Sequence, residues 1–221
     1  MSFERKAAKE GPPHKFSSET GMIRFLAPKF LATGLFCLAA ACGAREPQVA
    51  IPKEGVIALS EQFTGEFDLV DKSGNAVSDE DFEGKVMLVY FGFTNCPDVC
   101  PGDIGVMSAA LNELGDDADK VAAIFISVDP ERDTPQAITD YFAFDPRIVP
   151  LTGSVEAAAA ARGAYKLVAQ KETLKDSAVG YTVNHGRFFY INDRQGQPQY
   201  AIVGGISPQE LAALLRSAIR K

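Results

Sequence analysis

The chain contains 221 residues, of which 46% are hydrophobic and 23% are charged, and its formal charge is −7. This composition is typical of a globular protein and excludes a disordered chain, a collagen-like fibre and a disulfide-rich miniprotein. Because 29 acidic residues outnumber 22 basic ones, no basic excess is available to neutralise phosphates, and nucleic-acid binding is disfavoured. The chain has only four cysteines and two histidines, so their positions carry most of the functional information.

Residues 1–41 are predicted to be a signal segment. Arg24 and Lys29 precede an apolar stretch over residues 30–41 that ends in small residues, an arrangement typical of a secretory signal peptide. The stretch is shorter than the roughly 20 apolar residues that a membrane-spanning helix needs. The charged residues before Met22 do not belong in front of a signal peptide, so we expect translation to begin at Met22.

Cys42 is predicted to be a site of lipid attachment. The run over residues 38–43 resembles a bacterial lipobox, whose cysteine is lipidated and becomes the mature N-terminus. We therefore expect a lipid anchor on the periplasmic side of the bacterial cell envelope, at the inner membrane; plain cleavage and an uncleaved anchor are the alternatives. Residues 42–58 lack hydrophobic periodicity and contain two prolines, which predicts a tether from the membrane.

Residues 59–221 are predicted to form one domain in which strands and helices alternate. Near-continuous apolar runs predict strands that are buried on both faces, and helical spacing with capping residues predicts the helices. The predicted strands are 67–70, 85–94, 121–129, 165–171, 187–192 and 199–203, and the predicted helices are 96–115, 133–144, 154–163 and 207–221.

This order of elements predicts an α/β fold, a three-layer sandwich around a central mixed sheet. It is the thioredoxin-like order, with cysteines at the first junction between a buried strand and a helix. In thioredoxin-like folds the segment just before the strand at 187–192 faces the dithiol and usually carries a cis-proline. Here that segment has no proline and contains His185 instead.

Cys96 and Cys100 are the predicted reactive pair. Their spacing of four places them on one face of a helical turn, and a helix N-terminus favours the thiolate over the thiol. Thiol chemistry or metal binding is therefore expected, and a buried structural disulfide is the alternative.

His185 is the expected third partner of the two cysteines, although a single histidine is more often structural. Two thiolates and one imidazole suit Cu(I), and they suit Cu(II) when a further ligand is added. A structural zinc site needs four protein ligands, and only three candidates are present. We therefore expect copper at Cys96, Cys100 and His185.

Three segments in a fixed order resemble the motifs of the Sco/SenC family: 91–101, 128–135, and 183–185 with 189–193. The resemblance covers roughly residues 60–221. It implies a membrane-anchored, thioredoxin-like copper protein on the extracytoplasmic face. Members help to build the binuclear copper site of cytochrome c oxidase subunit II, and they bind copper at positions that match Cys96, Cys100 and His185.

Two residues depart from the family pattern beside the histidine. Asn184 stands where an acidic residue is frequent, and Gly186 stands where a small hydroxyl residue is usual. Both changes affect the surroundings that orient the imidazole. The stretch 129–135 is expected either to shape the rim of the site or to act as an ordinary helix-capping loop.

The predicted function is that of a copper metallochaperone, not an enzyme, whose partner is cytochrome c oxidase subunit II or another copper acceptor. The alternative is an extracytoplasmic thiol–disulfide oxidoreductase that reduces the acceptor's cysteines and is itself recharged by a thiol reductase. His185 discriminates between the two, because redox work does not require it. A peroxidase is disfavoured because Pro97 occupies the position three before Cys100 where a threonine is needed.

Overall fold

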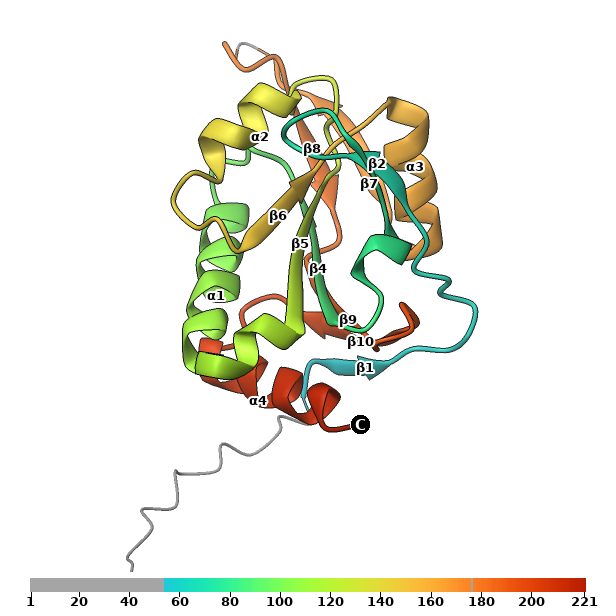
Figure 1. The fold of residues 1–221 in the computed structure, drawn as a ribbon. Helices are drawn as coiled ribbons and strands as arrows, with labels where there is room; N and C mark the ends of the chain where they lie inside the picture. Colours follow the sequence, from blue (N-terminus) through green and yellow to red (C-terminus); the bar gives the residue numbers. More distant parts are fainter. Residues whose placement is uncertain (1–53, 176) are drawn as a thin grey trace, which may run out of the picture. The chain divides into compact units, whose positions relative to one another are not determined.

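The computed structural model describes residues 54–175 and 177–221 (Figure 1). The strands are β1 (Val56–Ala58), β2 (Asp68–Val70), β3 (Ala76–Ser78), β4 (Val86–Gly92), β5 (Val121–Ser127), β6 (Ile148–Leu151), β7 (Ala169–Thr173), β8 (Tyr181–His185), β9 (Phe188–Asn192) and β10 (Pro198–Val203). The helices are α1 (Val99–Leu114), α2 (Pro135–Tyr141), α3 (Val155–Ala164) and α4 (Pro208–Ile219), with the short 3-10 helices η1 (Asp79–Phe82) and η2 (Gly115–Lys120).

A six-stranded mixed sheet forms the centre of the described domain, in the order β1-β10-β9-β4-β5-β6. Strands β4, β5 and β6 run parallel, and β9 pairs antiparallel with β4 and with β10. Every residue of β4 and β5 is buried, because both strands are almost entirely apolar and are covered on both faces. The predicted α/β sandwich around a mixed sheet is therefore confirmed.

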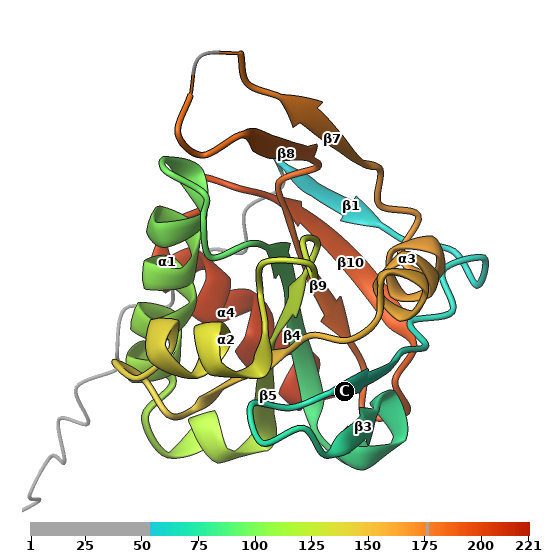
Figure 2. The same ribbon diagram turned by 90° about the horizontal axis from the view of Figure 1, so that it is seen from above.

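Helices cover both faces of this sheet. Helices α1 and α4 lie side by side on one face, and α3 lies on the opposite face with the β2–β3 hairpin (Figures 1 and 2). The helix starts follow their predicted caps: Thr134, Ser154 and Ser207 each accept a backbone N–H of the first turn. Ser207 and Glu210 complete the predicted capping box.

The hairpin of β7 and β8 forms a small sheet of its own and extends away from the central sheet (Figure 2). Ala169 pairs with His185 at its base, and Thr173 pairs with Tyr181 at its far end. Four of the five residues of β7 are exposed, whereas Val183 of β8 is buried in the core. His185, the last residue of β8, therefore lies at the base of this hairpin.

The predicted strand at 165–171 is wrong in position. Helix α3 continues to Ala164, and the chain then turns at Lys166, whose φ is +50°. Tyr165 is fully buried, with its ring centroid 5.2 Å from that of Phe91 and 4.9 Å from that of Tyr190. The aromatic residue that suggested a strand is therefore a core contact at the end of a helix, and β7 begins later, at Ala169.

Several short elements differ from the prediction. Residues 56–58, predicted as tether, form β1 and pair with β10, and β3, β6 and β8 were not predicted at all. Helix α2 ends at Tyr141 instead of residue 144. Strands of three to five residues contain too few positions to show a period. The signal segment, Cys42 and most of the tether lie outside the described residues, among which no helix is long and apolar enough to cross a membrane.

Candidate functional site

Strand ends bring the cysteines and the histidine together. Strand β4 ends at Gly92, and the loop 93–98 leads from it into α1. Strand β9 runs antiparallel to β4, with Phe189 opposite Tyr90. The residues just before β9 therefore lie beside the loop that follows β4, and the end of β8 reaches the same place.

The three predicted residues converge at this junction. The sulfur of Cys100 lies 3.7 Å from Nε2 of His185, and Cys96 lies close to Cys100. Both cysteines are free thiols, so this structure does not contain the structural disulfide that was the alternative. Cys96 lies in the loop before α1, where its N–H donates to the Phe93 carbonyl at 3.2 Å. The side chain of Cys100 projects from the first turn of the helix.

The imidazole of His185 is oriented by its own neighbours. Its Nδ1 lies 2.9 Å from the Gly186 carbonyl, which can only accept a hydrogen bond, so Nδ1 carries the proton. Nε2 then presents its lone pair toward the Cys100 sulfur. The ring meets that of Phe93 edge-on, with centroids 6.0 Å apart, and burial lowers the pKa of His185. This neutral tautomer is the one that binds a metal through Nε2.

Cys100 differs from the sequence-based expectation. It is fully buried, and this burial raises its pKa to about 12, outweighing the opposite effect of the neighbouring Phe93 N–H and Tyr90 hydroxyl. The expected preference for thiolate at the helix N-terminus is therefore wrong for Cys100, because loss of solvation outweighs the helix dipole. At neutral pH Cys100 keeps its proton, and a metal ion that binds there must displace it.

Gly92 provides the space that Cys100 occupies. A Cβ at this position would lie 2.8 Å from Cε2 of Phe125 and 3.3 Å from the Cys100 sulfur. The last residue of β4 is thus a glycine because the backbone, the aromatic core and the sulfur approach one another closely.

Asp133 fixes the cysteine loop to the end of β5. Its carboxylate accepts hydrogen bonds from the Thr94 N–H at 3.2 Å, from the Thr94 hydroxyl at 2.6 Å and from the Ser127 hydroxyl at 2.6 Å. Asp133 is fully buried, and burial raises its pKa. The adjacent Thr134 caps α2, so the stretch 129–135 both caps a helix and holds the loop that carries Cys96.

A second cluster ties the β7–β8 hairpin to the same stretch. The Tyr181 hydroxyl donates to Asp129 at 2.8 Å, and Asp129 also pairs with Arg132. The Arg132 guanidinium stacks 3.7 Å from the Tyr181 ring centroid and donates to the Tyr181 carbonyl, while the Lys171 ammonium lies 3.8 Å from the same ring. Sequence analysis did not identify this cluster, because its members come from separate segments.

The two departures beside the histidine have structural correlates. The Asn184 amide donates across the hairpin to Glu172 of β7, so this exposed side chain is occupied by its partner strand. At Gly186 a Cβ would lie 2.8 Å from Cε2 of Phe188 and 3.0 Å from Cδ1 of Leu167. The glycine therefore lets Leu167 and Phe188 pack closely next to His185.

The three side chains come together at this junction but do not form a closed metal site. Within residues 54–175 and 177–221, no group of three His, Cys, Asp or Glu side chains is arranged tightly enough to hold a metal ion. Cys100 and His185 already face each other, with the Cys100 sulfur 3.7 Å from Nε2 of His185, and Cys96 lies on the adjoining loop. Two soft thiol sulfurs and one imidazole nitrogen are the donor set that suits copper.

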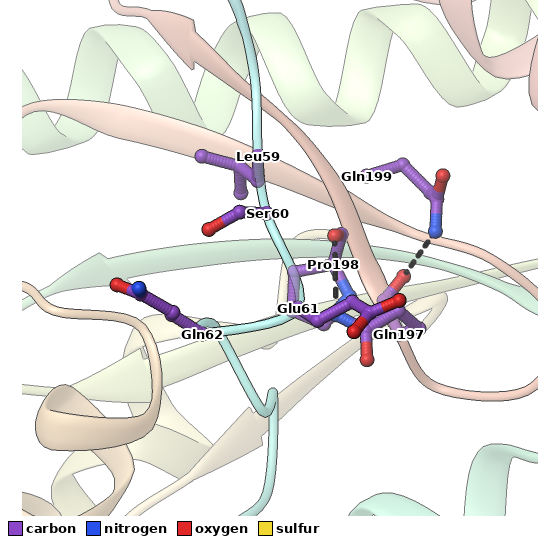
Figure 3. Close-up of a pocket in the computed structure, with 7 residues that line it drawn as sticks. All are labelled: Leu59, Ser60, Glu61, Gln62, Gln197, Pro198 and Gln199. Carbon is purple, nitrogen blue, oxygen red and sulfur yellow. Dashed lines mark hydrogen bonds between the residues drawn. The ribbon is translucent and has the colours of Figure 1, made fainter.

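A cavity of about 570 Å³ lies elsewhere, at the corner between β1 and β10 (Figure 3). Its lining contains neither cysteine nor histidine and consists of Leu59, Ser60, Glu61, Gln62, Gln197, Pro198 and Gln199. The amides of Gln197 and Gln199 donate to nearby backbone carbonyls. Because no cysteine or histidine lines this pocket, the cysteine–histidine junction is the better candidate site.

Comparisons with known proteins point to one family. The family model described as SCO1/SenC matches residues 57–220. Protein sco1 of Schizosaccharomyces pombe is 41% identical over 139 residues, and the match covers 62% of this chain but 53% of that protein. The SCO2-like protein RC0895 of Rickettsia conorii is 28% identical over 203 residues, covering 90% of this chain and 98% of that protein.

A solved structure supports the same assignment. The structure of Bradyrhizobium japonicum ScoI with copper bound superposes with a TM-score of 0.64 at 41% identity, covering 69% of this chain and 97% of that one. The predicted thioredoxin-like fold is confirmed by this likeness.

Proposed function

This chain belongs to the SCO1/SenC family, and from that membership we propose that it is a copper metallochaperone for the assembly of cytochrome c oxidase. Cys96, Cys100 and His185 would hold the copper. The observation that carries the proposal is the 3.7 Å approach of His185 Nε2 to the Cys100 sulfur, beside the free thiol of Cys96. A relative of 41% identity was solved with copper bound, which supports the assignment.

The site is better suited to a protein that carries and releases copper than to one that keeps copper as a permanent cofactor. Three protein ligands leave copper open to a thiolate or imidazole from an acceptor, whereas a closed site of four ligands would retain it. The open arrangement and the loop position of Cys96 favour capture and release. We propose subunit II of cytochrome c oxidase, or another copper acceptor, as the recipient.

The proposed location is the bacterial cell envelope, on the periplasmic side of the inner membrane. The apolar stretch over residues 30–41 followed by Cys42 supports anchoring through a lipid on that cysteine. An envelope location matches a recipient whose copper site is built outside the cytoplasm.

A second function, thiol–disulfide oxidoreduction, is favoured by the two adjacent free thiols. In this reaction Cys96 and Cys100 lose two electrons and two protons and form a disulfide, while a disulfide of the acceptor gains both and becomes two thiols. A thiol reductase would then restore the dithiol. His185 takes no part in this exchange, so it separates the two functions.

Copper titration of the full-length chain tests the proposal. The reduced protein and His185→Ala are titrated with copper against a coloured chelator, with Gln170→Ala, a change at an exposed residue of β7, as the control on the same hairpin. We expect one copper per chain, a sulfur-to-Cu(II) charge-transfer band, and affinity about tenfold or more weaker in His185→Ala only. Equal affinity of His185→Ala and the parent would remove the histidine from the site and favour the oxidoreductase.

A further inference from the structure

An ion pair lies directly behind the candidate copper site. The carboxylate of Asp103, on α1, receives two parallel hydrogen bonds from Arg187, which stands between β8 and β9: Nε to Oδ2 at 2.5 Å and Nη2 to Oδ1 at 2.6 Å. The Tyr90 hydroxyl donates to the same carboxylate at 3.0 Å. Two-pronged pairing between arginine and a carboxylate fixes direction as well as distance.

Each member of this group is adjacent to a proposed copper ligand. Asp103 follows Cys100 by three residues, so it lies on the same side of α1 one turn further along. Arg187 follows His185 by two residues. Tyr90 lies beside Cys100, since a Cβ on Gly92 would be 3.0 Å from Cε1 of Tyr90 and 3.3 Å from the Cys100 sulfur. The ion pair therefore connects the helix that carries Cys100 with the segment that carries His185.

Backbone hydrogen bonds alone do not connect the segment that carries His185 to α1. The ladder between β4 and β9 ends at the pair Tyr90 and Phe189, short of His185. The Gly186 N–H bonds to the Val168 carbonyl and the Arg187 carbonyl accepts from Gly204, so these bonds reach other segments and not α1. Among the hydrogen bonds and ion pairs of the described residues, those that join this segment to α1 are the contact between Cys100 and His185 and the bonds from Arg187 to Asp103.

The surroundings are shaped to hold the arginine in place. A Cβ on Gly204 would lie 2.5 Å from both Cγ and Nε of Arg187, so the glycine leaves the space in which the arginine stem runs. The Asp103 side chain is 1% exposed and that of Arg187 is 39% exposed. A buried carboxylate without its cation is strongly unfavourable, so Asp103 holds Arg187 firmly.

We propose that Asp103 and Arg187 are positioning residues that hold His185 against Cys100 and so set the geometry of the copper site. This inference rests on the proposed function and assigns to the pair a role that the copper-binding residues do not themselves perform. Loss of the pair is expected to release His185 from the site while both cysteines stay in place.

The test compares four forms of the full-length chain: the parent, His185→Ala, the double variant Asp103→Leu with Arg187→Met, and that double variant with His185→Ala added. Replacing both charges with apolar groups avoids a buried unpaired carboxylate. The measurements are copper affinity and the imidazole-nitrogen hyperfine coupling in the electron paramagnetic resonance spectrum of the Cu(II) form. A cooperative unfolding transition checks that each form is folded.

We expect the double variant to bind copper about tenfold more weakly and to lose the nitrogen coupling, as His185→Ala does. Adding His185→Ala to it should cost little more, because the two changes remove the same interaction. Arg187→Lys, which keeps the charge without the two-pronged contact, should fall between the parent and the double variant.

A matched control exists in the pair Asp145–Arg147, whose side chains are 5% and 41% exposed and which includes no proposed copper ligand. Asp145→Leu with Arg147→Met should leave copper affinity and the nitrogen coupling unchanged. If the folded Asp103/Arg187 double variant kept the parent's affinity and coupling, the positioning role would be wrong while the copper function stood. A parent chain that bound no copper would overturn both.

Discussion

At the scale of single residues, burial acts on Cys100 and His185 in opposite directions. It raises the pKa of Cys100 to about 12 and lowers the pKa of His185, since in each case it disfavours the charged form. Both side chains are therefore neutral at neutral pH, which is the state that an interior without metal prefers. Copper bound at the proposed site would replace the proton of Cys100 but would find the imidazole already deprotonated at Nε2.

This exchange predicts that copper affinity rises with pH. Because Cys100 keeps its proton up to about pH 12, binding releases that proton throughout the neutral range. Each proton released strengthens apparent binding about tenfold per pH unit. Competition titrations at about pH 6 and about pH 8 measure the slope, with Cys100→Ser as a control that lacks the thiol. An affinity that did not change with pH would show that Cys100 does not lose a proton to copper.

At the scale of elements, the β7–β8 hairpin depends on side-chain contacts because it lies outside the central sheet. Its outer strand is mostly exposed, and Tyr181 connects it to the stretch after β5 through Asp129 and Arg132. Since Tyr181 begins the strand that ends at His185, this cluster holds the far end of the element that carries the proposed ligand.

Substitution at Tyr181 is expected to loosen the hairpin. Tyr181→Ala removes the ring between Arg132 and Lys171 and the hydroxyl bond to Asp129, so opening of the hairpin should become easier by about 1–3 kcal/mol. Hydrogen exchange of the amides of β7 and β8 measures this opening, and amides of β4 serve as the internal reference. Tyr181→Phe, which keeps the ring, should show a smaller effect. Unchanged exchange in Tyr181→Ala would show that the cluster does not hold the hairpin.

At the scale of the whole molecule, the candidate site exists only in the folded chain. Its parts come from the loop 93–98, from the first turn of α1 and from the end of β8, and they meet because β4 and β9 are neighbours in the sheet. In the unfolded chain Cys100 and His185 are 85 positions apart. Copper that binds all three ligands therefore binds the native state in preference to the unfolded one.

Copper is accordingly expected to raise the thermal midpoint of unfolding. At a free copper concentration about a hundredfold above Kd the native state gains about 2.7 kcal/mol, which corresponds to roughly 5–10 °C for a domain of this size. Calorimetry of the reduced chain with and without copper measures the shift. Cys96→Ser, a change in the loop, should lose most of it; an equal shift in that variant would mean that Cys96 is not a ligand.

Sequence patterns were sufficient where the signal is local or chemically rare. The apolar runs of β4 and β5 identified the centre of the sheet, and Thr134 and Ser207 marked the starts of helices that the structure contains. Cys96, Cys100 and His185 were identified because the chain has only four cysteines and two histidines.

Tertiary structure decided what depends on partners distant in the chain. Tyr165 resembled a strand residue and is a core contact at the end of α3, and three-residue β1 exists because β10 is there to pair with it. The burial that keeps Cys100 protonated cannot be judged from its neighbours in sequence, which favour the thiolate. Arg187 meets Asp103 across 84 positions, and only the packing of β9 beside β4 brings them together. Composition and residue spacing determine which reactive side chains the chain has. Solvation and long-range contacts determine the protonation state of those side chains and which of them meet.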